Sequence, residues 1–66
     1  MDYTIIDKLT QMQNFIGLAM TDAEKFDNGN NAAGTRVRKH MQEVKKLAQS
    51  IRAQVSDIKN GVEDND

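Results

Sequence analysis

The sequence predicts an all-α fold: an antiparallel two-helix hairpin of the coiled-coil type that assembles into a dimeric four-helix bundle. Three observations support this prediction. The 66 residues include no proline, so long uninterrupted helices are possible. Apolar residues recur at steps of three and four through most of the chain, which is the period of an amphipathic helix. One strong turn signal, at residues 28–31, separates two such patterns.

The first helix is expected at about residues 3–27. Asp2 or Thr4 can cap its start, and Thr4 with Asp7 resembles a capping box. Gly17 costs about 1 kcal/mol relative to alanine inside a helix, but the apolar pattern continues through it. In heptad notation this pattern places Leu9, Ile16 and Ala23 at position a, and Ile5, Met12, Ala19 and Phe26 at position d.

The turn at residues 28–31 has the residues that end one helix and begin the next. Gly29 suits a left-handed stop, and Asn30 or Asn31 suits the N-cap of a second helix over about residues 32–60. Residues 61–66 are expected to form an acidic disordered tail, because acidic groups at a helix C-terminus oppose the helix dipole. In the second helix the apolar residues Met41, Ala48, Val55 and Val62 fall at a, and Val37, Val44, Ile51 and Ile58 fall at d.

A turn this short makes two long helices antiparallel neighbours. Residues whose numbers add to about 60 should then lie opposite one another. Gly34 falls opposite Phe26, so its missing side chain would make room for the ring. Six further pairs are apolar on both sides: Ile5–Val55, Leu9–Ile51, Met12–Ala48, Ile16–Val44, Ala19–Met41 and Ala23–Val37.

Additional apolar residues flank this predicted seam. A lone hairpin hides only one stripe of each helix, and a chain of this length rarely builds a sufficient core by itself. We therefore expect self-association as a homodimer or higher oligomer, with a monomer as the alternative. The candidate oligomer-interface residues are Ile6, Phe15, Leu18, Met20 and Leu47.

The side chains offer no catalytic constellation. The absence of cysteine excludes disulfides and thiolate metal sites, and no glycine-rich phosphate loop is present. We expect no enzyme activity, cofactor, metal or small-molecule substrate. His40 is interpreted as a flanking surface histidine, and Asp22, Glu24 and Asp27 as solvating charges near the turn. No apolar run is long enough for a membrane span, so a soluble cytoplasmic protein is expected.

Basic residues concentrate on one side of the second helix. Position e holds Arg38, Lys45, Arg52 and Lys59, which we call the basic rail. The first helix carries no acid between residues 8 and 21, so the rail is poorly neutralised and a polyanion is a plausible partner. No aromatic residue lies among these bases, which favours contact with duplex phosphates over base stacking. The candidate nucleic-acid-binding residues are Arg36, Arg38, Lys39, Lys45, Lys46, Arg52 and Lys59.

The turn and the start of the second helix read Gly29-Asn30-Asn31-Ala32-Ala33-Gly34-Thr35-Arg36-Val37-Arg38-Lys39, followed by Glu43, Lys46, Leu47, Ile51 and Arg52. This segment resembles the bacterial and phage linker-histone-like family, first associated with chlamydial nucleoids. The resemblance covers about residues 28–53. It implies a DNA-associated protein that compacts a nucleoid or genome and self-associates through its helices, with Arg36, Arg38 and Lys39 as signature bases. DNA-condensing members often carry a long basic tail, whereas residues 61–66 here are acidic.

Three functions are compatible with these observations. The first is a histone-like protein that binds duplex DNA without reading its sequence and helps to organise a nucleoid or genome, in the cytoplasm and associated with the nucleoid. The second is a structural or adaptor coiled-coil oligomer with no nucleic-acid role, whose basic rail is an ordinary solvated face or meets an acidic protein. The third is an RNA-binding dimer of helical hairpins.

Overall fold

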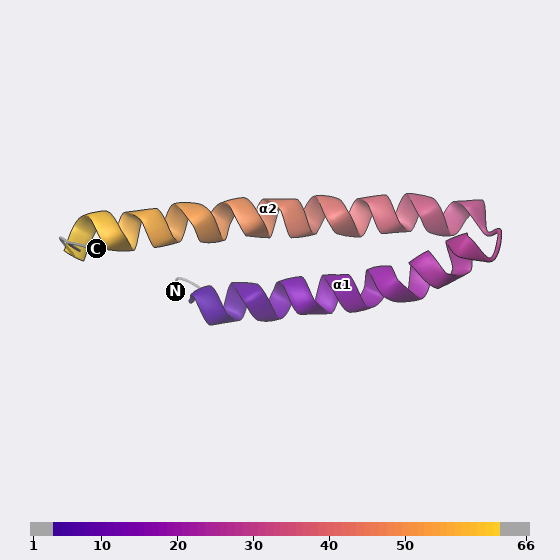
Figure 1. Cartoon of the computed structure of the whole chain (residues 1–66), viewed down its shortest axis with the longest axis horizontal. Coiled ribbons are helices and arrows are strands. Elements are labelled where there is room, and N and C mark those ends of the chain that lie inside the picture. Colours follow the sequence, from indigo (N-terminus) through magenta and orange to yellow (C-terminus); the bar gives the residue numbers. More distant parts are fainter. Residues whose placement is uncertain (1–3, 63–66) are drawn as a thin grey trace.

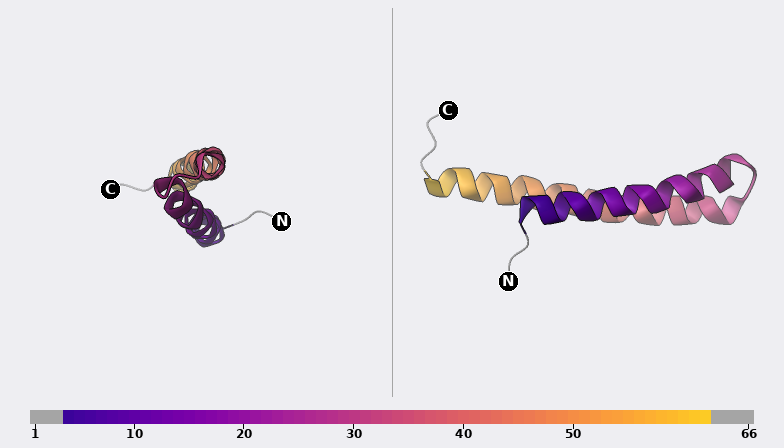
Figure 2. Two further views of the ribbon diagram at one scale, coloured as in Figure 1. Left: turned by 90° about the vertical axis from the view of Figure 1, so that its right-hand side faces the viewer. Right: turned by 90° about the horizontal axis from the view of Figure 1, so that it is seen from below.

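Two α-helices form the whole of the described structure. The computed structural model describes residues 4–62, in which α1 spans Ile5–Asp27 and α2 spans Asn31–Val62. The helices run antiparallel as a rod, joined by a tight turn at one end (Figure 1). At the other end α2 extends past the start of α1. Two further views show that the helices stay side by side along the rod (Figure 2). The predicted all-α hairpin is confirmed.

The start of α1 has the predicted capping box. The Asp7 backbone N–H donates to Thr4 Oγ1 over 3.1 Å, and the Thr4 N–H donates to Asp7 Oδ2 over 3.2 Å. Each side chain therefore satisfies a backbone donor that the first helical turn leaves without a partner. Asp2, the alternative cap, lies outside the described residues.

The turn follows from its glycine and its asparagines. Gly29 has a φ of 103°, a conformation that other residues rarely adopt, and its N–H donates to the carbonyl of Phe26 over 2.9 Å. Asn30 caps α2, because its Oδ1 accepts a hydrogen bond from the Ala33 N–H over 3.2 Å. These contacts fix both helix ends within a few residues of each other.

The end of α2 differs from the expected boundary. The helix continues to Val62, so residues 61 and 62 belong to it rather than to a tail. Gly61 does not stop the helix, since a single glycine costs only about 1 kcal/mol in a helix interior. The rest of the predicted tail, residues 63–66, lies outside the described residues.

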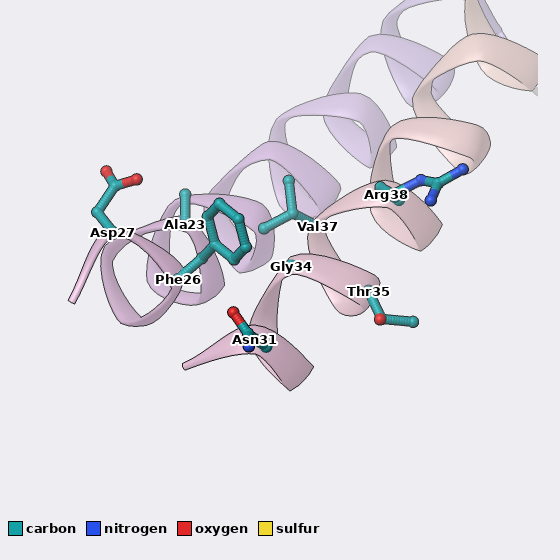
Figure 3. A pocket seen from close by; sticks show the side chains of 8 residues that line it. All are labelled: Ala23, Phe26, Asp27, Asn31, Gly34, Thr35, Val37 and Arg38. Carbon is teal, nitrogen blue, oxygen red and sulfur yellow. The ribbon is translucent and has the colours of Figure 1, made fainter. Parts of the chain in front are cut away.

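The axial register of the two helices agrees with the predicted pairing. Lys8 Nζ donates to Ser50 Oγ over 2.7 Å across the hairpin, and Phe26 lies against Gly34. A Cβ atom added to Gly34 would lie 2.6 Å from two carbons of the Phe26 ring, which is closer than real Cβ contacts. The ring and the bare backbone of Gly34 face one another (Figure 3). The packing role predicted for Gly34 is confirmed.

The rotation of the helices about their own axes differs from the prediction. Four apolar a residues keep a large part of their surface exposed: Leu9 44%, Ile16 43%, Met41 41% and Val55 40%. By contrast, the g residues Lys8, Phe15, Asp22, Ala33 and His40 are buried or half-buried. The seam therefore combines positions d and g. The predicted a-to-d pairs lie at the right level, but their a residues lie on a flank of the hairpin.

The seam makes only a thin core. Among the described residues, the buried hydrophobic ones are Ala19 and Ala33, and no large side chain is fully buried. Both of these small residues lie in the half of the rod toward the turn. A core of this kind gives one hairpin little hydrophobic stabilisation, because that term scales with the apolar area removed from water.

Candidate nucleic-acid interface

The basic rail forms one exposed line along α2. Arg38, Lys45, Arg52 and Lys59 are all exposed. Among the residues that the structure describes, none of these four takes part in an ion pair. A helix rises about 1.5 Å per residue, so consecutive members of the rail stand ~10.5 Å apart along the helix axis. The rail is therefore a linear array of uncompensated positive charge.

The remaining predicted bases differ in their surroundings. Lys39 is exposed beside the rail. Lys46 is also exposed, but its Nζ lies 3.6 Å from Glu43 Oε1 one helical turn earlier. An exposed pair of this type contributes little to stability and leaves the lysine free to exchange partners. Lys39 and Lys46 extend the positive face around α2.

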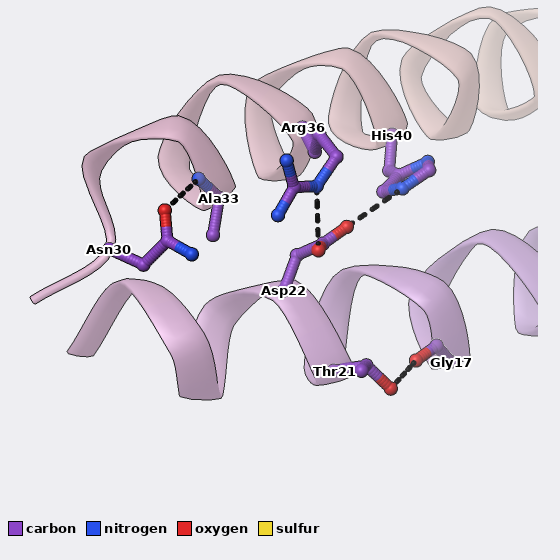
Figure 4. A network of polar contacts seen from close by, with 7 residues as sticks. All are labelled: Gly17, Thr21, Asp22, Asn30, Ala33, Arg36 and His40. Atoms are coloured by element: carbon purple, nitrogen blue, oxygen red, sulfur yellow. Dashed lines mark hydrogen bonds and ion pairs between the residues drawn. The ribbon is translucent and has the colours of Figure 1, made fainter. Parts of the chain in front are cut away.

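Arg36 points toward α1 and has a partner there. Its Nε donates to Asp22 Oδ1 over 2.9 Å, and His40 Nε2 lies 3.3 Å from Asp22 Oδ2 (Figure 4). Asp22 is 8% exposed, so the interpretation of this carboxylate as a solvating charge was wrong. The three side chains form a polar cluster that joins the helices near the turn, and we call it the Asp22 cluster.

His40 is correspondingly less exposed than a surface histidine. Its side chain is 20% exposed, and its ring centroid lies 6.2 Å from that of Phe15. The g positions of both helices therefore meet through Asp22, Phe15 and His40. This explains the rotation of the seam, because a buried carboxylate must face its hydrogen-bond donors.

The hydrogen bond from Arg36 holds the pKa of Asp22 below its ordinary value of 3.8. Desolvation of the carboxylate opposes this effect, while the positive charge of Arg36 and the contact with His40 add to it. Because the folded pKa is the lower one, the charged carboxylate stabilises the hairpin at all pH values above about 4. This stabilisation is lost as the pH falls through the folded pKa.

We therefore expect the melting temperature to decrease on acidification from pH 6 to pH 2.5, and to decrease less in Asp22→Asn. The asparagine cannot titrate, so the difference between the two profiles isolates Asp22 from the other acids. Thermal unfolding followed by circular dichroism across this range measures both profiles. If the melting temperature decreased equally in the two proteins, protonation of Asp22 would not contribute to the loss of stability.

The candidate oligomer residues lie in three different places. Ile6 and Met20 are each 69% exposed on α1. Leu18 is 54% exposed, but it stands at position c, on the other flank of the hairpin. Phe15 and Leu47 are half-buried at g positions of the hairpin's own seam. The structure thus does not gather these five residues on one surface.

A hollow of about 580 Å³ opens near the turn. Phe26, Ala23, Val37 and Gly34 supply its apolar lining, and Arg38 stands at its edge (Figure 3). Within residues 4–62, no three potential ligands are grouped so that they could hold a metal ion. In the same range no helix combines the length and apolar character needed to cross a membrane.

Sequence reasoning did not find Asp22 as a structural residue. A signal was available, because Asp22 stands level with both Arg36 and His40 in the predicted register. Heptad analysis scores apolar residues and passes over a polar group of this kind. The exposed rail, in contrast, follows directly from the spacing of its bases.

Comparison with known proteins agrees with the resemblance of the turn segment. The model of a family described as "Histone H1-like protein Hc1" matches residues 6–61. No curated protein and no solved structure matches the chain significantly. The family match includes nearly all of both helices and the turn with its signature bases. On this match, the chain belongs to the histone H1-like Hc1 family.

Proposed function

We propose that this protein binds duplex DNA through the phosphates, with the basic rail as its main contact, and that it helps to organise a nucleoid or genome. Membership of a histone-like family suggests a DNA-binding nucleoid protein. The observation that carries the proposal is the exposure of four evenly spaced bases without an acidic partner in the described residues. Lys39 and Lys46 stand close enough to assist.

The geometry of the rail favours contact with the DNA backbone. From Arg38 to Lys59 the rail spans ~31 Å along the helix, close to the length of one turn of B-DNA. Lysine and arginine at this spacing can neutralise phosphates along the DNA backbone. They do not form a pattern of hydrogen-bond donors and acceptors that would recognise base edges. Binding should therefore be weakly selective for sequence and strongly dependent on salt.

Arg36 has a different place in this proposal. Its guanidinium already neutralises Asp22, so we assign it chiefly to the hairpin's own stability rather than to phosphate contact. Self-association would give each particle a second rail, and therefore a second place at which a duplex can bind.

Fluorescence anisotropy with a labelled DNA duplex between 50 and 300 mM salt tests the proposal. Four phosphate contacts from one rail predict a slope of about −3.6 in a plot of log K against log salt concentration. Binding that does not change with salt, or no binding at 50 mM, would contradict phosphate contact. A structured RNA competitor that displaces the DNA much better than unlabelled duplex would redirect the proposal to RNA.

A further inference from the structure

We infer that a second copy of this chain covers one particular apolar face of the hairpin, the face formed by the a positions. We call it the a face; it consists of Leu9, Ile16 and Ala23 from α1 and Met41, Ala48 and Val55 from α2. This inference deepens the self-association proposed above by naming its surface, and it does not depend on DNA binding.

The a residues of both helices lie on the same side of the hairpin. In an antiparallel pair, identical heptad positions share a flank. Since the seam uses positions d and g, the a residues of α1 and of α2 border it on one side. In the observed register they follow one another along the rod in the order Val55, Leu9, Ala48, Ile16, Met41 and Ala23. The face is therefore continuous and alternates between the two helices.

The composition of this face fits helix packing. It carries no charged residue, and along the rod each pair of larger side chains, Val55 with Leu9 and Ile16 with Met41, is followed by a small one, Ala48 or Ala23. Such alternation creates the holes that side chains of a facing helix can enter. Near the turn the face continues into the hollow lined by Phe26 and Val37. The four largest a residues are 40–44% exposed, so each retains apolar surface for a partner.

The small core of the hairpin favours a second copy of the chain as the partner that covers the a face. The hairpin has no fully buried large side chain among its described residues, so its own seam does not supply the core that a chain of this size needs. Packing two a faces together buries both at once and gives each chain the missing core. An interface of this kind is isologous, since the same residues serve on both sides of a two-fold axis.

The margins of the a face select one arrangement of the two copies. The α1 margin, position e, carries the uncharged residues Ile6, Gln13 and Met20 and the acid Asp27, while the α2 margin is the basic rail. A two-fold axis parallel to the helices places each rail beside the α1 margin of the other copy, which carries no base. The alternative axis, perpendicular to the helices, would place the two rails against each other and cost repulsion between like charges.

This assignment changes the set of interface residues expected from the sequence. Ile6 and Met20 stay at its margin. Leu18 lies on the opposite flank, and Phe15 and Leu47 are half-buried within the hairpin. Leu18 therefore provides a matched control for Ile16: both are exposed aliphatic residues in the middle of α1, and they lie on different flanks.

Sedimentation velocity and equilibrium measurements on the full chain test the inference. We expect the unmodified protein to be a dimer at micromolar concentration. Ile16→Glu should weaken dimerisation by 100-fold or more, because two charges would be buried at the centre of the interface. Leu18→Glu should leave the dimer unchanged. Loss of the dimer in Leu18→Glu with retention in Ile16→Glu would overturn the assignment of the face, and so would a folded monomeric wild-type protein.

Ile16→Glu could also prevent folding, so a second measurement on the unmodified chain is needed. If dimerisation completes the core, the melting temperature must rise with protein concentration. A melting temperature that is constant over a 100-fold range of concentration would overturn the inference without any variant. The fluorescence anisotropy experiment tests a separate claim. DNA binding that does not change with salt would contradict phosphate contact by the basic rail, but it would not affect the dimer, which is tested by the sedimentation measurements.

Discussion

Replacing Lys45 and Arg52 with glutamine is expected to weaken binding to duplex DNA roughly 50- to 100-fold at 0.1 M salt. Each phosphate contact contributes a factor of about 8 at this salt concentration, through the release of a counterion. The same double variant should reduce the slope of log K against log salt concentration by about 1.8. Both residues are exposed and free of ion pairs in the described structure, so the fold should be unaffected.

The matched control replaces Lys8 and Lys25 with glutamine. It removes the same net charge, but from α1 and away from the rail. Lys8 donates to Ser50 across the hairpin, and glutamine keeps a donor at that position. We expect the control to bind DNA within about threefold of the unmodified protein, because distant charges are screened beyond ~10 Å at 0.1 M salt. Equal losses in both variants would indicate that total charge, not the rail, determines affinity.

Gly34→Val is expected to lower the free energy of unfolding by about 1–3 kcal/mol. The new Cβ would overlap the Phe26 ring, which lies 2.6 Å from that position, and the branched methyl groups would take up further space. The ring would have to leave the contact with Gly34 and expose its covered face to water. Urea unfolding at one fixed protein concentration measures the change.

Gly17→Val is the control for this substitution. Gly17 is also helical, but a Cβ added there has no neighbour within 4 Å. Valine has a slightly better helix propensity than glycine, so Gly17→Val should raise the free energy of unfolding by about 0.3 kcal/mol. An equal gain in stability in both variants would contradict the prediction that the Phe26 ring packs against Gly34 only because this residue has no side chain.

The elements that the sequence predicted well are those determined by local chemistry. The capping box of Thr4 and Asp7, the left-handed Gly29 and the capping asparagine each act within a few residues, so their sequence is sufficient to place them. The axial register follows from the same turn, because its length fixes where the second helix starts. The contact of Phe26 with Gly34 was predictable for this reason.

The rotation of each helix about its axis was not predictable from apolar spacing. Apolar residues occupy a, d and parts of e and g, so the stripe is wide enough to face its partner in more than one way. The choice between these rotations depends on Asp22, Arg36 and His40, whose hydrogen bonds and charges pull the g positions into the seam. Such a tertiary polar contact leaves no periodic signal in the sequence.

The family signature consequently combines two kinds of residue. Gly34 and Arg36 have internal partners, Phe26 and Asp22, and so contribute to the hairpin itself. Arg38 and Lys39 are exposed and have no ion pair among the described residues. Spacing gives each base its heptad position, but the division depends on which positions face α1, and that rotation could not be predicted from apolar spacing.

The unequal length of the two helices gives the rod a gradient of local stability. Near the turn, α2 is held by its cap and by the Asp22 cluster. Beyond Val55, which stands level with the start of α1, it continues without a neighbouring helix in the hairpin (Figure 1). Local opening therefore requires the least free energy at the end that carries Lys59, and the most beside Arg38. A phosphate bound at Lys59 would have to order this last part of the helix, whereas one bound at Arg38 would meet a surface that is already fixed.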